Sequence, residues 1–558
     1  MAVAPDQTVK AEYQSRLAQW SRRAAEEEQA HRRMGNWRLL LAAGIVALAA
    51  ALCRTGVGVG LSFVILALGM FLTGLLHNRV ETAWRRARRA MGFYQAGLDR
   101  LDGTWAGKEA AALAGKSYGT EFLEPHHPFA ADLDLFGAGS LFALLNTAQT
   151  EGGAATLAAW FLVPAAPEEI RARQGAVNEL SPRLDLRERL GLIAAEAQGW
   201  IRTKALVHWA AQPRLLQSKI VRNGVFWLPI ASLVFFLTGQ WVLFLAASAG
   251  QFALARLSHR AVQKVVHDMG MAPRELERLA DVLRCLESEP FKSERLRRME
   301  AEGRGDGLSA SQAIERLGKL HAWMESGNNL VFAAICRFFL WETQFAFALE
   351  AWRARFGPKV GMWLRRLAEF EALSSLAGYA CEHPADLFPE LLPAAEPARI
   401  EAEGLGHPLL PDSRCVRNDL VLGPQNRLIM ISGSNMSGKS TWLRSIGVNL
   451  VLASAGATVR ARKFRLTPVR IGASIRTTDS LQEGVSRFYA EVQRLGTIVK
   501  LAGDGTPLVF LLDEVLSGTN SHDRLIGASC VAQSLVRRGA LGLMTTHDLA
   551  LTRIVEEL

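Results

Sequence analysis

The sequence contains no pair of cysteines at close spacing. Its six cysteines are scattered along 558 residues without a CxxC motif: Cys53, Cys285, Cys336, Cys381, Cys415 and Cys530. This spacing excludes a disulfide framework and a zinc site built from paired ligands. We therefore expect reduced thiols in a cytosolic setting.

The chain also lacks the short basic start and early apolar run of a cleavable signal peptide. Residues up to Arg33 are charged and typical of a helix, so we expect no segment to be removed. No repeat of fixed period is visible. The length predicts three or four domains at roughly 150 residues each. A formal net charge of +10 fits either nucleic acid or an anionic membrane face, and charge alone does not choose between them.

Two apolar runs lie near the N-terminus. Residues 39–53 are wholly apolar, and residues 56–76 carry no charge. A helix needs about 20 apolar residues to cross a bilayer. Basic residues stand on both outer flanks: Arg32, Arg33 and Arg38 before the runs, then Arg79, Arg85, Arg86, Arg88 and Arg89 after them. The positive-inside rule predicts a transmembrane hairpin with both ends in the cytoplasm.

A second uncharged stretch covers residues 225–255. It is bracketed by Lys219 and Arg222 on one side and by Arg256 and Arg260 on the other. Gly239 and Gln240 fall in its middle and favour two short helices over one long tilted helix. A hairpin also keeps the phosphate-binding loop, described below, in one compartment with the basic flanks. The alternative for both stretches is a set of buried core helices in a soluble protein.

The remaining chain divides into a helical part and an α/β part. Residues 180–211 and 275–349 carry apolar residues at three- and four-residue spacing, as amphipathic helices do. Proline and glycine become frequent in residues 383–411, which indicates a linker. Beyond it, short β-rich runs alternate with helices, the pattern of an α/β fold.

A phosphate-binding loop follows the apolar strand pattern of residues 428–431. It has the GxxxxGK[ST] spacing and contains Gly433, Ser434, Asn435, Met436, Ser437, Gly438, Lys439, Ser440 and Thr441. Glycines let backbone N–H groups turn toward phosphates in a strand–loop–helix context. Lys439 is expected to reach the β- and γ-phosphates of ATP, and Ser440 to bind Mg²⁺.

Two further strand patterns end in polar residues. The apolar run of residues 508–512 leads into Asp513 and Glu514. A carboxylate pair at the end of a buried strand needs a partner, and a metal supplies one. We expect Asp513 to hold the Mg²⁺ shell and Glu514 to polarise the attacking water. His547 follows a third strand and is placed to sense the γ-phosphate or orient that water, although a lone His is more often structural.

These motifs resemble those of the MutS family, within the ABC-type ATPases. The resemblance is carried by SGSNMSGKSTWLRSIG, LLDEVLSGTNSHD and TTHD, and by GHPLL, VRNDL and DSLQEGVSRFYAEVQRL in the same order. Residues from Asp132 and from Trp363 are similar to the start and end of the family's helical lever domain. By this resemblance Ser486 is the serine that a partner subunit presents to the γ-phosphate, and Glu491 is the acidic residue that closes its segment.

The sequence also departs from the family pattern. The mismatch-reading N-terminal domain has no counterpart before Asp132. The second apolar stretch interrupts the lever region, where mismatch repair members insert a DNA-gripping clamp. Only eleven residues follow His547, so the C-terminal dimerisation element is expected to be missing or very short. Mismatch recognition is therefore in doubt, while the ATP chemistry is not.

The sequence thus predicts an α/β P-loop NTPase domain of MutS-like type, preceded by an all-α lever domain and transmembrane helical hairpins. The expected segments are a basic helix (1–36), a hairpin (37–78), a helical linker (79–130), a lever domain (131–395) with a second hairpin at 223–256, and the ATPase domain (396–558).

We expect a multi-pass protein of the inner, cytoplasmic membrane, with a cytoplasmic ATPase domain that uses ATP and Mg²⁺. A homodimer through the ATPase domains would hydrolyse ATP and couple it to lever motion and to binding of double-stranded or branched DNA. Phosphate contacts are expected from basic helix residues, namely Arg295, Arg297, Arg298, Arg365 and Arg366. The alternative is a membrane scaffold or remodelling ATPase that binds no DNA.

Overall fold

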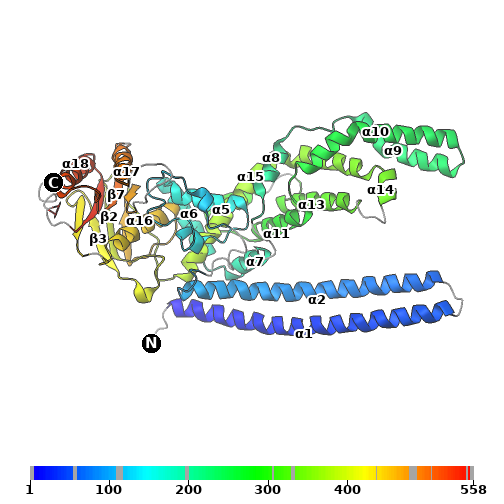
Figure 1. Cartoon of the computed structure of the whole chain (residues 1–558), viewed down its shortest axis with the longest axis horizontal. Helices are drawn as coiled ribbons and strands as arrows, with labels where there is room; N and C mark the ends of the chain where they lie inside the picture. The colour runs from blue at the N-terminus through cyan, green and yellow to red at the C-terminus, as the bar shows by residue number, and fades with distance from the viewer. Residues whose placement is uncertain are drawn as a thin grey trace.

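The molecule is elongated, with an α/β domain at one end and two helical arms that extend to the other end (Figure 1). The computed structural model describes residues 5–54, 59–107, 117–194, 200–303, 307–327, 333–434, 436–476, 487–503, 505–547 and 551–552. Five of the cysteines carry free thiols: Cys285, Cys336, Cys381, Cys415 and Cys530.

The first arm is an antiparallel pair of long helices, α1 (Pro5–Arg54) and α2 (Val59–Leu101). The basic N-terminal segment and the first apolar run therefore form one helix, without a break near residue 36. A single Gly35 in that region is tolerated in a helix interior, whereas a proline would end it. Helix α2 likewise continues from the second apolar run into its basic flank.

The base of the first arm is fixed to the helical domain by buried polar contacts. Arg100 donates two hydrogen bonds, of 2.7 and 2.5 Å, to the Glu382 carboxylate. The Tyr13 hydroxyl donates to the same carboxylate at 3.4 Å. At the surface, Arg16 also pairs with the exposed Asp185 at 2.9 Å. Paired buried charges hold a defined geometry because an unpaired one would be costly, so the base of the arm is firmly positioned.

Helical segments of moderate length make up the centre of the molecule. They are η1 (Thr120–Phe122), α4 (Leu141–Leu145), α5 (Glu151–Leu162), α6 (Pro167–Leu180), α7 (Leu184–Ala194), α8 (Thr203–Ala211), α11 (Pro273–Ser288), α12 (Glu294–Gly303), α13 (Ala310–Ser326) and α14 (Ala333–Phe338). The helical patterns predicted for residues 180–211 and 275–349 are thus interrupted. Pro290 lies in one break, and a capping box at Ser309 and Gln312 starts α13, because such local hydrogen bonds begin a new helix.

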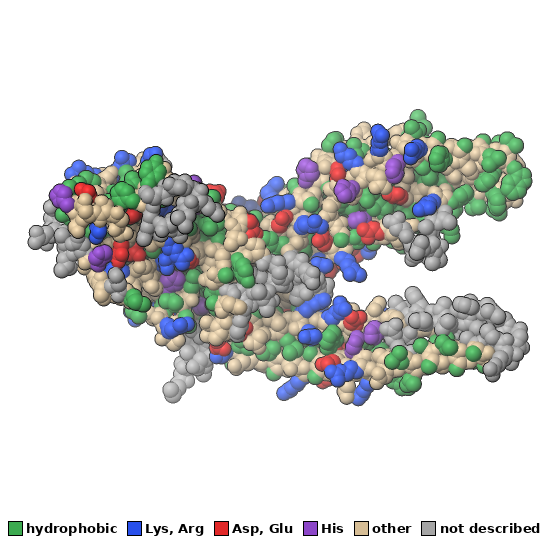
Figure 2. All heavy atoms as spheres, viewed as in Figure 1, with side chains coloured by type: hydrophobic (Ala, Val, Ile, Leu, Met, Phe, Trp, Pro, Cys, Tyr) green, Lys and Arg blue, Asp and Glu red, His purple; other side chains and the backbone are tan. Residues whose placement is uncertain are grey.

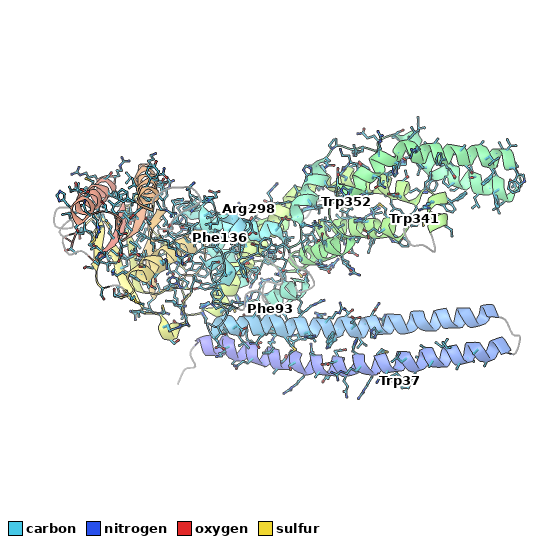
Figure 3. All side chains as sticks on the ribbon, in the orientation of Figure 1. Trp37, Phe93, Phe136, Arg298, Trp341 and Trp352 are labelled. Atoms are coloured by element: carbon cyan, nitrogen blue, oxygen red, sulfur yellow. The ribbon has the colours of Figure 1, made fainter. Side chains whose placement is uncertain are left out.

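The long helix α15 (Trp341–Glu382, 42 residues) connects these parts. Two of its tryptophans, Trp341 and Trp352, which are labelled in Figure 3, bind α13 through their indole N–H groups. Trp352 donates to the carbonyl of Ala313 and Trp341 to that of Trp323, each at 2.8 Å. Helix α15 therefore links the second of the two arms, which is described below, to the middle of the molecule.

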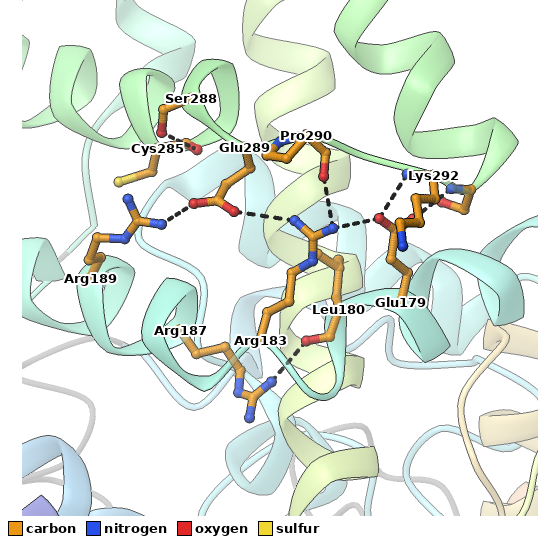
Figure 4. Close-up of polar contacts among 11 residues, drawn as sticks. Glu179, Leu180, Arg183, Arg187, Arg189, Cys285, Ser288, Glu289, Pro290 and Lys292 are labelled. Atoms are coloured by element: carbon orange, nitrogen blue, oxygen red, sulfur yellow. Dashed lines mark hydrogen bonds and ion pairs between the residues drawn. The ribbon is translucent and has the colours of Figure 1, made fainter.

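A charged cluster ties α6 and α7 to the turn between α11 and α12 (Figure 4). Arg183 binds Glu179 at 2.7 Å and Glu289 at 3.2 Å. Glu179 also accepts backbone N–H groups from Lys292 and Ser293, at 2.8 and 2.6 Å. Burial opposes the charge of Glu179, but these donors and Arg183 lower its pKa. The Glu179 carboxylate, which accepts hydrogen bonds from several donors, therefore holds the turn between α11 and α12 in place.

The second arm contains another antiparallel helix pair, α9 (Lys219–Leu237) and α10 (Trp241–His267). The turn between them includes Gly239 with a positive φ of 72°, a backbone conformation that glycine adopts without strain. The hydroxyls of Ser232 and Ser248 lie 2.9 Å apart between the two helices. In Figure 1 the α9–α10 turn and the ends of α1 and α2 lie at the same end of the molecule.

The α/β domain contains two sheets. A mixed sheet has the order β1-β5-β2-β3, and a parallel sheet has the order β4-β8-β7-β6. The strands are β1 (Glu390–Leu391), β2 (Ile400–Leu405), β3 (Asn418–Leu422), β4 (Leu428–Ser432), β5 (Lys463–Leu466), β6 (Arg470–Ser474), β7 (Leu508–Asp513) and β8 (Leu541–Thr546). The helices are η2 (Asp412–Arg414), α16 (Lys439–Ala455), α17 (Arg487–Leu501) and α18 (Ser521–Arg537).

Candidate nucleotide site

The predicted site residues of the described chain gather at the carboxyl ends of the parallel strands. Strands β4, β8 and β7 are neighbours, with Ser432 opposite Thr546 and Asp513 opposite Thr545. Parallel strands end at one edge of a sheet, and ligands of open α/β sheets bind outside that edge. The phosphate loop follows β4, Asp513 is the last residue of β7, and His547 follows β8.

The phosphate loop joins β4 to the first turn of α16. Its backbone needs left-handed conformations at Met436 and Gly438, whose φ angles are 64° and 91°. The Met436 side chain is fully exposed. Gly438 caps α16, so the positive end of the helix dipole faces the loop. Ser440 lies in the first helical turn, and Asn435 lies outside the described residues.

Lys439 is buried and folds back over the loop. Its ammonium group donates to the carbonyls of Gly433 and Ser434, at 2.8 and 2.9 Å. A buried ammonium must have acceptors, and two carbonyls of the loop supply them here. The lysine is thereby held beside the loop where we expect the phosphates to bind.

Thr545 contacts both acidic residues at the end of β7, Asp513 in the strand and Glu514 directly after it. Its hydroxyl donates to Asp513 Oδ1 and accepts the backbone N–H of Glu514, the latter at 3.1 Å. Glu514 has a positive φ of 46°, an uncommon conformation for a residue with a side chain. Its carboxylate lies 3.6 Å from His547 Nδ1, and both side chains are partly exposed. The structure therefore brings Glu514 and His547 together.

Glu491 supports the turn that follows Glu514. It is buried, and its Oε1 accepts the N–H of Leu516 at 2.6 Å. Leu516 has a φ of 56°, so this bond holds a second unusual backbone conformation. Sequence reasoning assigned no role to Thr545, because its contact depends on the register of β7 and β8. The available sequence signal is that Thr545, which carries a hydroxyl, ends one apolar strand pattern while Asp513 ends another.

The donor set fits a nucleotide with a hard divalent cation. Lys439 and the loop N–H groups suit phosphate oxygens, while the Ser440 hydroxyl and the Asp513 carboxylate are oxygen ligands of the kind that Mg²⁺ prefers. Ser486 lies outside the described residues, so its position beside a nucleotide stays a prediction.

The basic residues proposed for DNA contact lie on α12 and α15. Arg295 pairs with Glu169 at 3.2 Å and also with Glu369. Arg298, labelled in Figure 3, pairs with Glu294 at 3.0 Å. The buried Arg366 pairs with Glu302 at 3.0 Å.

Comparison with known proteins identifies the C-terminal region. Residues 429–558 match the family model of MutS domain V, a P-loop ATPase-type domain. The chain is 37% identical over 150 residues to Endonuclease MutS2 of Thermus thermophilus, a match that covers 27% of this chain and 20% of that protein.

Two further relatives are similar over a somewhat longer region. The chain is 33% identical over 192 residues to DNA mismatch repair protein MutS of Thermotoga petrophila, covering 34% of this chain and 23% of that protein. It is 35% identical over 198 residues to DNA mismatch repair protein MutS 2 of Halobacterium salinarum, covering 35% and 22%. The chain thus spans only a fifth to a quarter of the length of these relatives.

Proposed function

We propose that the protein is a MutS-family ATPase that binds and hydrolyses ATP with Mg²⁺ at the ends of β4, β7 and β8. The observation that carries this proposal is the convergence of Asp513, Glu514 and the buried Lys439 on one sheet edge, in a region that matches MutS domain V. A phosphate loop beside an acidic strand end is the arrangement that phosphoryl transfer to water uses.

Each side chain has a separate task in this proposal. Lys439 binds the β- and γ-phosphates, and Ser440 with Asp513 holds Mg²⁺, which neutralises phosphate charge when bound. Glu514 polarises the attacking water and takes its proton on the carboxylate. His547, 3.6 Å from that carboxylate, orients it. Thr545 fixes the direction of Asp513 and of the Glu514 backbone.

Hydrolysis is proposed to need a homodimer. By family resemblance, Ser486 faces the γ-phosphate of the other protomer and supplies a donor that each site lacks by itself. Two ATP molecules would then lie between two ATPase domains. The dimer interface would consist of the sheet edge described above and the partner's Ser486 segment.

Membrane anchorage is the second part of the proposal. Among the described residues, α9 and α10 are long and apolar enough to cross a bilayer, and only 17% and 11% of their apolar windows are buried. Core helices of a soluble domain would be mostly buried. Large apolar side chains are exposed on both helices: Ile220, Trp227, Leu237, Trp241, Val242, Phe252 and Leu257. Figure 2 shows this apolar surface at the end of the second arm.

The first arm ends in the same direction. Trp37, Leu39, Leu40 and Val46 are exposed on α1, and Figure 3 shows Trp37 on the outer side of the arm. Figure 2 shows open space between the two arms. Since both apolar ends lie at one end of the molecule, a single bilayer would accept both. Residues 5–38 of α1 would then hold the arm base about 50 Å from the bilayer, at about 1.5 Å per residue.

Binding of double-stranded or branched DNA is the third part, coupled to lever motion. The names of the relatives, which are mismatch repair proteins and an endonuclease, support it. The alternative is a membrane scaffold or remodelling ATPase without DNA. Two of the five arginines proposed for DNA contact, Arg295 and Arg366, are mostly buried in ion pairs with Glu369 and Glu302.

Two substitutions test the ATPase assignment. Lys439→Ala should abolish nucleotide binding, whereas Glu514→Gln should retain bound, unhydrolysed ATP. Retention of radiolabelled ATP by the detergent-solubilised protein separates the two. A Glu514→Gln variant that turned over at the parental rate would show that another group polarises the water.

DNA binding is tested separately with the same preparation. A DNA-binding protein should bind duplex or branched DNA with an affinity that falls steeply as salt rises, because phosphate contacts release counterions. Binding without salt dependence, or no binding at low salt, would favour the scaffold alternative.

A further inference from the structure

Large apolar side chains are exposed where α13, α14 and α15 meet. Trp323, near the end of α13, is 59% exposed, and Ile335, on α14, is 56% exposed. The ring of Trp341, at the start of α15, lies 6.2 Å from the Trp323 ring between centroids. We call Trp323, Ile335 and Trp341 the aromatic corner. Grouped apolar side chains on a surface mark a contact with a protein or a membrane.

The aromatic corner is attached to the base of the α9–α10 hairpin. Leu340, between α14 and α15, has a φ of 50°, a conformation that a residue with a side chain keeps only where its surroundings hold it. Its side chain is buried in one cluster with Val225 of α9 and Phe347 of α15. Gln263 of α10 donates a hydrogen bond to Glu342 of α15 at 2.9 Å. Both helices of the hairpin therefore hold the corner in place.

The base of this hairpin also carries six exposed basic residues, on α9, α10 and α14: Lys219, Arg222, Arg256, Arg260, Lys264 and Arg337. Within the described part of the chain, none of the six forms an ion pair. Two carboxylates near the corner have other partners, because Glu342 accepts from Gln263 and Glu325 lies 3.5 Å from His321 Nε2. Exposed positive charge thus surrounds the aromatic corner.

A bilayer with anionic headgroups fits both features at one level. Tryptophan is favoured at the membrane–water interface because its ring is apolar and its N–H group is polar. Lysine and arginine are attracted to anionic headgroups at the same depth. The corner is also continuous with α9 and α10, whose apolar surface we propose to enter the bilayer. Figure 3 shows Trp341 on the second arm and Trp37 on the first, both toward the same end of the molecule.

We propose that the aromatic corner lies in the headgroup layer of an anionic phospholipid bilayer, as a membrane contact separate from the apolar hairpins. This inference rests on the proposed membrane anchorage. A hairpin that enters a bilayer alone is free to tilt, whereas interfacial aromatic and basic side chains beside it fix its tilt. The corner therefore restrains the angle between the second arm and the membrane.

Fluorescence quenching measures the depth of single positions in the full-length protein. The native cysteines are replaced, and one introduced cysteine carries a nitrobenzoxadiazole group. The protein is reconstituted in vesicles of phosphatidylcholine and phosphatidylglycerol, with a nitroxide lipid labelled at its headgroup or deep in its acyl chain. Ile335→Cys probes the corner, and Leu233→Cys on α9 is the control for the bilayer interior. Val421→Cys on β3 is the matched aqueous control, because Val421 is 55% exposed.

The label at Ile335 should be quenched more strongly from the headgroup than from the acyl chain. The label at Leu233 should show the reverse order, and the label at Val421 should be quenched from neither depth. If Ile335 behaves as Val421 does while Leu233 is quenched from the acyl chain, the inference is wrong and the anchorage stands. If Leu233 is not quenched either, the anchorage itself fails, and the inference with it.

A second copy of the chain is the competing occupant of the corner. In that case the label at Ile335 would be quenched from neither depth, and it would become shielded from dissolved iodide as the ratio of protein to lipid rises. This result would overturn the assignment to lipid.

The charge of the lipid is tested with Arg337→Gln. One cation near an anionic surface changes a binding equilibrium about fivefold, so the ratio of docked to undocked corner, measured by headgroup quenching at Ile335, should fall about fivefold. Arg355→Gln is the matched control and should have no effect, because Arg355 lies about 21 Å along α15 from Trp341, beyond the screening length of about 10 Å in 0.1 M salt. Equal headgroup quenching of the unsubstituted and Arg337→Gln proteins, and in vesicles of phosphatidylcholine alone, would contradict the anionic partner.

Discussion

At the residue scale, Thr545 controls two groups of the candidate site through one hydroxyl. It donates to Asp513 and accepts from the Glu514 backbone. A hydrogen bond to a charged group contributes about 1.5–3 kcal/mol. We expect Thr545→Val, which keeps the shape but removes the hydroxyl, to lower the ATPase rate roughly ten- to a hundredfold.

The matched control is Thr545→Ser, which keeps the hydroxyl and should retain most of the activity. Steady-state rates at saturating ATP and a titration with Mg²⁺ measure the effect. Equal rates for the valine and serine variants would show that the hydroxyl has no role in the site.

A second prediction at this scale concerns the buried His407. Burial, with Arg444 and Arg460 nearby, lowers its pKa to about 4, against about 6.5 in an unfolded chain. Between these values the unfolded chain binds the proton and the folded chain does not. His407 should therefore have no effect on the pH dependence of the free energy of unfolding above pH ~6.5. As the pH drops from there toward 4, its protonation in the unfolded chain should lower that free energy by ~3 kcal/mol.

The His407→Asn variant isolates this contribution, because asparagine can still accept the N–H of Leu409 that His407 Nδ1 accepts at 3.2 Å. Melting temperatures of wild type and variant are compared between pH 7 and 4.5. The variant should lose less stability on acidification. Parallel curves would mean that His407 is not the group that titrates.

Lys439, Asp513 and Glu514 can be proposed from the sequence because their motifs have fixed spacing next to strand patterns, and the structure places them at one sheet edge. The sequence does not predict the contacts of Thr545 or of Asp132, whose Oδ1 accepts the backbone N–H of Ile475. The first depends on the register between β7 and β8, and the second joins residues more than 340 positions apart. Neither is encoded in local spacing.

At the element scale, helix α16 packs closely against the segment that carries Asp132. A Cβ added at Gly447 would lie 2.4 Å from Leu133 Cδ2. Extra volume in a packed core costs about 1–3 kcal/mol. We expect Gly447→Ala to destabilise the ATPase domain by that amount, measured as the shift of its thermal unfolding.

Gly496 in α17 is the matched control, because a Cβ there meets no atom within 4 Å. Gly496→Ala should stabilise the protein by about 0.5–1 kcal/mol through helix propensity alone. A second variant, Leu133→Ala, should relieve part of the cost of Gly447→Ala when the two are combined. If Gly447→Ala and Gly496→Ala destabilised the protein equally, the contact between Gly447 and Leu133 would not explain the effect.

The helical patterns of residues 275–349 show the limit of periodicity at this scale. Apolar spacing identifies the buried faces of α11 and α13, but it does not report the breaks between helices. These breaks coincide with Pro290 and with the capping box at Ser309, which are local signals of only a few residues.

At the scale of the whole molecule, the common direction of the two arms predicts a membrane topology. If both apolar ends enter one bilayer and return, the four basic flanks lie in the cytoplasm. Cysteines introduced beside Arg33, Arg85, Arg222 and Arg260, in a background without the native cysteines, should be protected from an impermeant thiol reagent in intact cells.

Labelling of one flank of the second arm, but not the other, would indicate a single crossing there. Release of the whole chain from membranes by carbonate would contradict the anchorage. A cysteine at the turn near Gly239 is the positive control for the reagent, since the hairpin topology exposes that turn outside the cytoplasm.

The sequence predicts that apolar runs exist and where they turn, but not that they end at the same side of the molecule. That arrangement depends on α15, whose two ends contact elements from opposite parts of the chain. Arg100 and Glu382, for example, are 282 positions apart.

Because of this separation in sequence, the two residues are synthesised at different times. At translation rates of about 5–20 residues per second, Glu382 leaves the ribosome roughly 15 to 60 s after Arg100. During that interval α1 and α2 are complete, while Arg100 and Tyr13 have not yet met their carboxylate. The first arm must therefore persist as a nascent hairpin without its anchor until α15 has been synthesised, and it can dock before the strands and helices that follow Glu382 have left the ribosome.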